Sequence, residues 1–243
     1  MRGGECGSHR EFTIMKLASQ DSIASLDADF GAMAVKRGRY AWGLPQLSMR
    51  EKAFVFVAAD LCCRALQFPL QTHVMMALSN GVKLEDIREV VRHLAPYVGY
   101  PTAAETLMRL IEIEKAAGEA GLATNDENSG TPQGQPQEAR LPDGAVQQLK
   151  ALDEDFAAFV QEQFEERWGR PNLTVAERAL ATIATDVLNG TLDQSFAQHV
   201  GLALDNGAAE EKVRAVLLLV AEFGMAKTGR AFAALADVLA ARR

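Results

Sequence analysis

Two aspartate–histidine pairs occur at the same spacing, and either pair could carry out acid–base chemistry. Asp60 precedes His73 by the same number of residues as Asp186 precedes His199. Each aspartate falls near the end of one expected helix, and each histidine lies about one turn into the next. A short connection makes such helices antiparallel neighbours, so the side chains can meet. The carboxylate would then fix the imidazole tautomer and raise its pKa, as a general acid or base requires, although a purely structural buried pair is also possible.

His93 and Tyr97 form a second candidate for chemistry. They are four residues apart and therefore lie on one face of a helix, which a glycine and a proline break directly afterwards. An imidazole and a phenol on the same face can hydrogen-bond an oxygen atom of a bound substrate. The equivalent positions 126 residues later carry Leu219 and Phe223, so the fold does not need the polar groups. This difference favours a functional role in the first half of the chain.

The equivalence comes from an internal duplication with an offset of 126 residues. HVMMALSNG at 73–81 returns as HVGLALDNG at 199–207, and residues 25–107 align with 151–233 without a gap. In that alignment 25 of 83 positions are identical, several times what composition alone would give. The chain is therefore predicted to contain one structural unit twice.

Each copy is expected to be helical, because apolar residues recur at intervals of three and four without strand-like alternation. Ser48 with Glu51, and Thr174 with Glu177, match the capping box that begins a helix. The fourth helix of each copy is so apolar that we expect it to be buried between the units. The predicted fold class is all-α, with two tandem helical bundle domains. The helices expected in the first copy cover about 25–38, 49–63, 69–80, 84–97 and 102–117.

Composition divides the chain into four segments. Residues 1–20 are predicted to be a flexible N-terminal arm, and 21–117 form the first domain. Residues 118–144 are rich in Gly, Pro, Gln, Asn and acidic side chains with few large apolar residues, which predicts a disordered linker. Residues 145–243 form the second domain.

Charge and cysteine content limit the partners and the compartment. The net charge of −7, with scattered lysines and arginines, argues against nucleic acid and anionic membranes. No run of about 18 apolar residues and no secretion signal appear. Cys6, Cys62 and Cys63 are poorly spaced for disulfides, which favours a reducing cytoplasm. We expect a cytoplasmic protein whose partners are a small-molecule substrate and other protein chains.

The motifs resemble those of the carboxymuconolactone decarboxylase and alkylhydroperoxidase-D-like superfamily. The resemblance covers nearly all of both copies and implies small helical units that associate into trimers or hexamers. It therefore implies a homo-oligomer, with a trimer of tandem chains favoured. The matching segments are WGLPQLS at 42–48, WGRPNLT at 168–174, HVMMALSNGV at 73–82 and HLAPYVGYP at 93–101.

Neither copy carries the two-cysteine motif of the peroxidase members. The positions seven and four residues before each histidine hold Leu66 and Pro69 in the first copy, and Leu192 and Ser195 in the second. A dithiol peroxidase needs one thiolate to attack the peroxide and another to resolve the product. We therefore do not expect a thiol peroxidase.

The resemblance implies a lyase that acts without a cofactor on a small carboxylated lactone or an aromatic or polyketide-type compound. The reaction would be decarboxylation or a related proton transfer. His73, supported by Asp60, is expected to deliver the proton, and His93 and Tyr97 to hold the developing oxyanion. The residues expected to bind substrate are Arg170, which would orient an anionic group, together with Trp42, His199 and Asp186.

Two other functions are compatible with the same residues. One is a metal-dependent oxygenase-type tailoring enzyme that holds a divalent ion such as iron through His73, His93, His199 and Asp60. No tight helical ligand spacing supports it, so no metal site is predicted. The other is a non-catalytic binding or assembly protein on the same scaffold.

Overall fold

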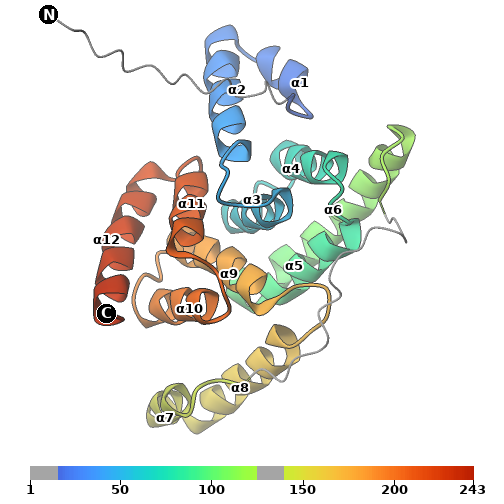
Figure 1. The fold of residues 1–243 in the computed structure, drawn as a ribbon. Helices are drawn as coiled ribbons and strands as arrows, with labels where there is room; N and C mark the ends of the chain where they lie inside the picture. The colour runs from blue at the N-terminus through green and yellow to red at the C-terminus, as the bar shows by residue number, and fades with distance from the viewer. Residues whose placement is uncertain (1–15, 125–139) are drawn as a thin grey trace, which may run out of the picture. The chain divides into compact units, whose positions relative to one another are not determined.

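The computed structural model describes residues 16–124 and 140–243, and all its regular elements within those ranges are helices (Figure 1). This confirms the predicted all-α fold class. Residues 1–15 of the expected arm and 125–139 of the expected linker lie outside the described residues. The chain divides into two compact units, which end at Pro45 and Arg243. The helices are α1 (Gln20–Ala24), α2 (Ala28–Trp42), α3 (Met49–Cys63), α4 (Phe68–Ser79), α5 (Leu84–Val98), α6 (Tyr100–Glu119), α7 (Asp143–Leu152), α8 (Glu154–Trp168), α9 (Val175–Asn189), α10 (Gln194–Asp205), α11 (Glu210–Val220) and α12 (Met225–Ala241).

The described part of the first unit is the helix pair α1 and α2. The side chain of Asp27 caps α2 by accepting a hydrogen bond from the backbone N–H of Phe30 at 2.7 Å. Gly31 lets the two helices approach closely, because a Cβ atom there would lie 2.7 Å from the Cα of Ala24. Trp42, one of the expected substrate-binding residues, is the last residue of α2.

The second unit contains the repeated helices of both copies. Helices α3 and α4 return as α9 and α10 with the same lengths, each 126 residues later. The predicted capping boxes are confirmed: Ser48 with Glu51 begins α3, and Thr174 with Glu177 begins α9. The duplicated sequence therefore produces duplicated local structure.

Four apolar helices form the core of the second unit. Helices α3 and α9 pack on each other, and both α5 and α11 contact each of them. The prediction that the fourth helix of each copy is buried between the two repeated segments is confirmed, because α5 contacts α9 and α11 contacts α3, and both helices are largely buried. The copies thus share one core, and the side chains of one copy can reach the other.

Charged side chains also join the two copies in this unit. Arg50 on α3 pairs with Glu177 on α9 at 2.7 Å, and Lys212 on α11 pairs with Glu51 on α3. No helix within the described ranges is both long and apolar enough to span a lipid bilayer.

Candidate active site

Both predicted aspartate–histidine contacts are present. The Nδ1 atom of His73 lies 2.7 Å from a carboxylate oxygen of Asp60, and Nδ1 of His199 lies 2.6 Å from one of Asp186. Each aspartate comes from the last turns of its helix, α3 or α9, and each histidine from the middle of the next one. Both aspartates and His199 are buried, whereas the side chain of His73 is partly exposed. The spacing in the sequence therefore predicted these contacts correctly.

The surroundings of His199 come from both copies. Its ring stacks on Trp168 with ring centroids 5.7 Å apart, and its edge meets Tyr97 of α5 at 5.5 Å. Trp168 donates a hydrogen bond from its indole N–H to the hydroxyl of Tyr97 at 3.1 Å, and His93 packs against the same indole at 4.8 Å. The five residues Asp186, His199, Trp168, Tyr97 and His93 are called the His199 cluster below.

The described surroundings of His73 are apolar by comparison. The ring of Phe56 stacks on the imidazole with centroids 4.4 Å apart, and Phe223 lies at 6.1 Å. Asp60, His73, Phe56 and Phe223 are called the His73 cluster. Phe223 belongs to the second copy, so this cluster also combines residues of both copies.

The two clusters differ at equivalent positions in a consistent way. Phe56 in the first copy corresponds to Thr182 in the second, and Phe223 in the second copy corresponds to Tyr97 in the first. His93 corresponds to Leu219, which is buried. The polar members of these three pairs all gather near His199 although they come from different copies. The grouping of His93 and Tyr97 with His73, which the sequence analysis assumed, is therefore wrong, because the structure places them beside Trp168 and His199.

Asp186 is held more firmly than Asp60. One oxygen of Asp186 accepts hydrogen bonds from the hydroxyls of Ser195 and Thr191, each at 2.8 Å, and the other faces His199. The equivalent positions in the first copy are Pro69 and Ala65, which have no hydroxyl. One buried oxygen of Asp60 accordingly lacks a hydrogen-bond partner among the described residues.

Burial of Asp60 also shifts its pKa. It raises the pKa of this carboxyl above its ordinary value, against the opposing effect of His73. The first pair is therefore less strongly fixed as a carboxylate–imidazole pair than its geometry alone would indicate.

The hydrogen bonds of Thr182 indicate which ring nitrogen of His93 carries the proton. Thr182 donates its single hydroxyl proton to the backbone oxygen of Arg178 at 2.8 Å, so it can only accept from Nε2–H of His93, which lies 2.9 Å away. The Nδ1 atom of His93 is then an unprotonated acceptor, buried without a partner among the described residues. Burial, together with the positive charge of Arg178, holds the pKa of His93 well below its usual value, which keeps the ring neutral.

A cavity of about 440 Å³ lies beside the His199 cluster. His199, Tyr97, Ser195 and further polar residues line it together with apolar residues of α7 and α8, among them Phe156, Val160 and Phe164. Since Asp186 holds Nδ1 of His199, the Nε2 atom, which has no hydrogen-bond partner among the described residues, is left for a ligand. The volume suits a small organic molecule.

Tyr97 is suited to donate a hydrogen bond in this cavity. Burial raises the pKa of Tyr97 to about 12, against the opposing effect of the hydrogen bond from Trp168. The phenol therefore keeps its proton at neutral pH. Because the indole N–H occupies one lone pair of the hydroxyl oxygen, the hydroxyl proton is available to an oxygen atom of a ligand.

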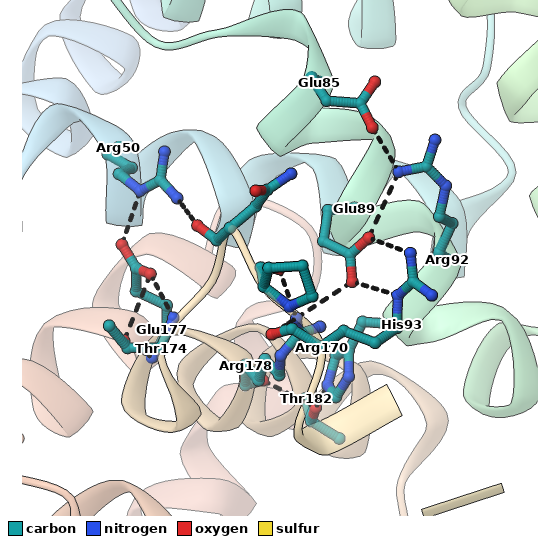
Figure 2. Close-up of polar contacts among 12 residues, drawn as sticks. Arg50, Glu85, Glu89, Arg92, His93, Arg170, Thr174, Glu177, Arg178 and Thr182 are labelled. Carbon is teal, nitrogen blue, oxygen red and sulfur yellow. Dashed lines mark hydrogen bonds and ion pairs between the residues drawn. The ribbon is translucent and has the colours of Figure 1, made fainter. Parts of the chain in front are cut away.

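Arg170, which the sequence analysis expected to orient an anionic substrate, binds a protein carboxylate in the structure. It donates two hydrogen bonds to buried Glu89, at 2.8 and 3.1 Å, and Glu89 also contacts Arg178 at 3.0 Å and Arg92 at 3.3 Å (Figure 2). Burial works to raise the pKa of Glu89, but the hydrogen bonds and charges of Arg170 and Arg178 outweigh it and lower that pKa. Arg170 does not line the cavity beside His199.

The alternative of a metal-dependent enzyme requires a group of side chains that could bind a metal ion. Within residues 16–124 and 140–243, no three or more His, Cys, Asp or Glu side chains are grouped so that they could hold a metal ion. Whether the site works without a cofactor stays a prediction. The two described cysteines do not form a disulfide, and burial raises the pKa of Cys62 to about 12.

Three residues near the site were not predicted from the sequence: Thr182, Ser195 and Thr191. Thr182 fixes the tautomer of His93, and the other two hold Asp186. A signal was present for all three, because each is polar where its counterpart in the other copy, Phe56, Pro69 or Ala65, is not.

Fold and site together define a duplicated all-helical protein with one buried aspartate–histidine pair in each copy and a cavity at the second pair. The sequence model of the carboxymuconolactone decarboxylase family matches residues 28–112 and again 154–237. The chain belongs to this family, and the double match supports the tandem duplication.

The chain is also similar to a solved structure. A crystal structure from Burkholderia xenovorans LB400, provisionally assigned as a gamma-carboxymuconolactone decarboxylase subunit, is similar to the chain. The identity is 20%, the alignment covers 93% of this chain and 90% of that one, and the TM-score is 0.49. No curated protein matches the chain.

Proposed function

We propose that the chain is a lyase that acts, without a cofactor, on a small carboxylated lactone or an aromatic or polyketide-type acid at the His199 cluster. The observation that carries this proposal is the arrangement of His199. Its Nδ1 is held by Asp186, and the ring borders a cavity into which Tyr97 also projects. Family membership supports decarboxylation or a related proton transfer as the reaction.

The proposed reaction needs two groups, one for the electrons and one for the proton. Breaking the C–C bond to the carboxylate releases CO₂ and leaves the bonding pair on the substrate, where an adjacent carbonyl takes it up as an enolate. Tyr97 donates a hydrogen bond to the enolate oxygen, and protonated His199 then delivers a proton from Nε2 to the carbon atom. Proton uptake from solvent returns His199 to its starting state, so atoms and charge balance.

Asp186 and His93 have supporting roles in this proposal. Asp186 orients the imidazole by accepting a hydrogen bond from Nδ1–H. His93 donates Nε2–H to Thr182 and has no proton on Nδ1, so it cannot donate to an oxyanion. We assign it a positioning role: its ring packs against Trp168, which in turn binds the hydroxyl of Tyr97.

The apolar wall of the cavity favours loss of the carboxylate. Phe156, Val160 and Phe164 offer no hydrogen bonds to an anionic group, whereas the charge moves towards Tyr97 and His199 as the bond breaks. The same wall explains why an aromatic or lactone ring suits the cavity better than a highly charged substrate.

The test is a screen of carboxylated lactones, including γ-carboxymuconolactone, and aromatic acids, with mass-spectrometric detection of CO₂. We expect His199→Gln to abolish the activity that the wild type shows, and the matched variant His73→Gln to retain it. Circular dichroism checks that both variants are folded. Activity that depends on His73 and survives in His199→Gln would overturn the proposal.

We also propose that the chain forms a homo-oligomer, with a trimer of tandem chains favoured. Family membership and large apolar side chains that are more than half exposed, such as Phe159 and Met108, support self-association. Light scattering coupled to size-exclusion chromatography measures the mass of the assembly. A monomer at micromolar concentration would contradict this expectation.

A further inference from the structure

A second cavity, of about 490 Å³, lies where α5, α6 and α8 meet. Three arginines line it: Arg92 from α5, Arg167 from the end of α8, and Arg170 just after α8. The apolar part of its wall consists of Val91, Ala95, Ala103, Ala104 and Leu107. It shares no lining residue with the cavity beside His199.

The arginines are held in place by protein groups. Arg170 binds Glu89 through Nε and Nη2, and Arg92 binds Glu85 and Glu89 through Nη1. Arg167 donates to Tyr100 and to the backbone oxygen of Gln163. Their guanidinium groups are therefore oriented before any ligand arrives, which lowers the entropic cost of binding.

Unused donors remain on two of these arginines. Among the described residues, Nη2 of Arg92 and Nη1 of Arg170 have no hydrogen-bond partner, and both side chains are partly exposed, at 36% and 42%. Two guanidinium groups with free N–H groups match the geometry of a carboxylate or phosphate.

The local charge also favours an anion. Four arginines, Arg92, Arg167, Arg170 and Arg178, are bound to three glutamates in the ion pairs around this cavity. An excess of positive charge remains here, although the whole chain carries −7. Glu166 lines the cavity beside the three arginines, whereas Glu89, the glutamate that most of the arginines share, is buried and does not line it.

We propose that this cavity, called the arginine pocket, is a second binding site that takes an organic anion. The ligand has a carboxylate or phosphate that Arg92 and Arg170 bind, and an apolar body that lies against the alanines and leucine of α5 and α6. The proposal does not depend on the proposed lyase activity, since the arginine pocket and the cavity beside His199 are lined by different residues.

Binding is measured by isothermal titration calorimetry of the full chain with three matched probes. These are 3-phenylpropionate, phenyl phosphate and the neutral 3-phenylpropanamide. We expect saturable binding of one or both anions and at least tenfold weaker binding of the amide. Comparison of the two anions distinguishes a carboxylate from a phosphate ligand. No saturable binding of either anion up to about 10 mM would overturn the proposal.

Two variants with matched controls locate the binding. Arg92→Gln removes a lining guanidinium, and Arg88→Gln removes an arginine of the same helix that also pairs with Glu85 but does not line the pocket. Ala104→Glu adds a negative charge to the exposed wall of the pocket. Met108→Glu adds the same charge one turn further along α6, where Met108 is 69% exposed. We expect the first member of each pair to weaken anion binding about tenfold or more and the second to leave it unchanged.

A variant in the other cavity tests whether the probes bind there instead. Gln148→Glu adds a charge to the exposed rim of the cavity beside His199. Anion binding that is lost in Gln148→Glu but retained in Ala104→Glu would place the ligand beside His199 and overturn the arginine pocket. The reverse result supports it, whatever the variants do to CO₂ release.

Discussion

Replacement of Asp186 by asparagine tests whether the orientation of His199 matters. The carboxylate accepts three hydrogen bonds: from Ser195 and Thr191 on one oxygen, and from His199 on the other. In Asp186→Asn the amide oxygen is expected to stay with the two hydroxyls, because both need an acceptor. The amide NH₂ then faces Nδ1 of His199, which must become the acceptor, so the proton of the neutral ring moves to Nε2.

The expected loss of activity follows from that tautomer change. With Nε2 protonated in the neutral ring and an amide NH₂ facing Nδ1, the ring has no acceptor for a proton on Nδ1, so His199 can no longer cycle as an acid and base. General acid–base catalysis contributes about 10²- to 10⁴-fold, so we expect kcat to fall by that factor, or about 3–5 kcal/mol of activation free energy. The matched variant Asp60→Asn is expected to leave kcat at the wild-type level.

Two measurements check this prediction. Steady-state CO₂ release gives kcat for both variants, and ¹⁵N NMR of histidine-labelled protein reports which ring nitrogen carries the proton, without need of a substrate. An Asp186→Asn variant with the inverted tautomer and wild-type kcat would refute the reasoning. So would a loss of activity confined to Asp60→Asn.

Three further predictions follow from the structure. Tyr97→Phe is expected to lower kcat about 10²- to 10³-fold because it removes the proposed donor to the enolate, whereas Phe223→Tyr beside His73 leaves kcat unchanged; steady-state kinetics measures both. Because the pKa of His93 is depressed in the folded chain, the unfolded chain binds the extra proton first as the pH falls below the ordinary value of 6.5. Urea denaturation should therefore show wild-type stability falling below pH 6.5, by up to about 1.4 kcal/mol per pH unit, and a flatter profile in His93→Leu. Glu89→Gln leaves buried Arg178 without its charged partner, and we expect the free energy of unfolding to drop by about 3–5 kcal/mol in the same assay.

The helices and the aspartate–histidine contacts could be predicted from the sequence because they depend on local signals. Ser48 and Thr174 begin α3 and α9 at the predicted residue, since a capping box satisfies backbone groups within four residues. Asp60 contacts His73 because the short connection between α3 and α4 makes the two helices pack side by side. Neither prediction depends on how residues elsewhere in the chain pack.

The composition of each cluster could not be predicted in the same way. The duplication predicts the contacts within each copy. It does not predict whether His73 or His199 packs near α5 of the first copy, nor which of them packs near α11 of the second. That choice depends on how four apolar helices share one core. The available signal was the coordinated difference between Thr182 with His93 and Phe56 with Leu219, which links positions from different copies. The contact of Arg170 with Glu89 could not be predicted for a related reason: Glu89 is distant in sequence and could not be matched to Arg170 by spacing.

A crystal structure of the full chain soaked with an unreactive analogue of the best substrate from the screen tests the location of the active site most directly. We expect density for the analogue in the cavity lined by Phe156 and Phe164, with an oxygen atom within hydrogen-bond distance of the Tyr97 hydroxyl and the reacting carbon facing Nε2 of His199. Density beside His73 instead, with the cavity at His199 empty, would contradict it.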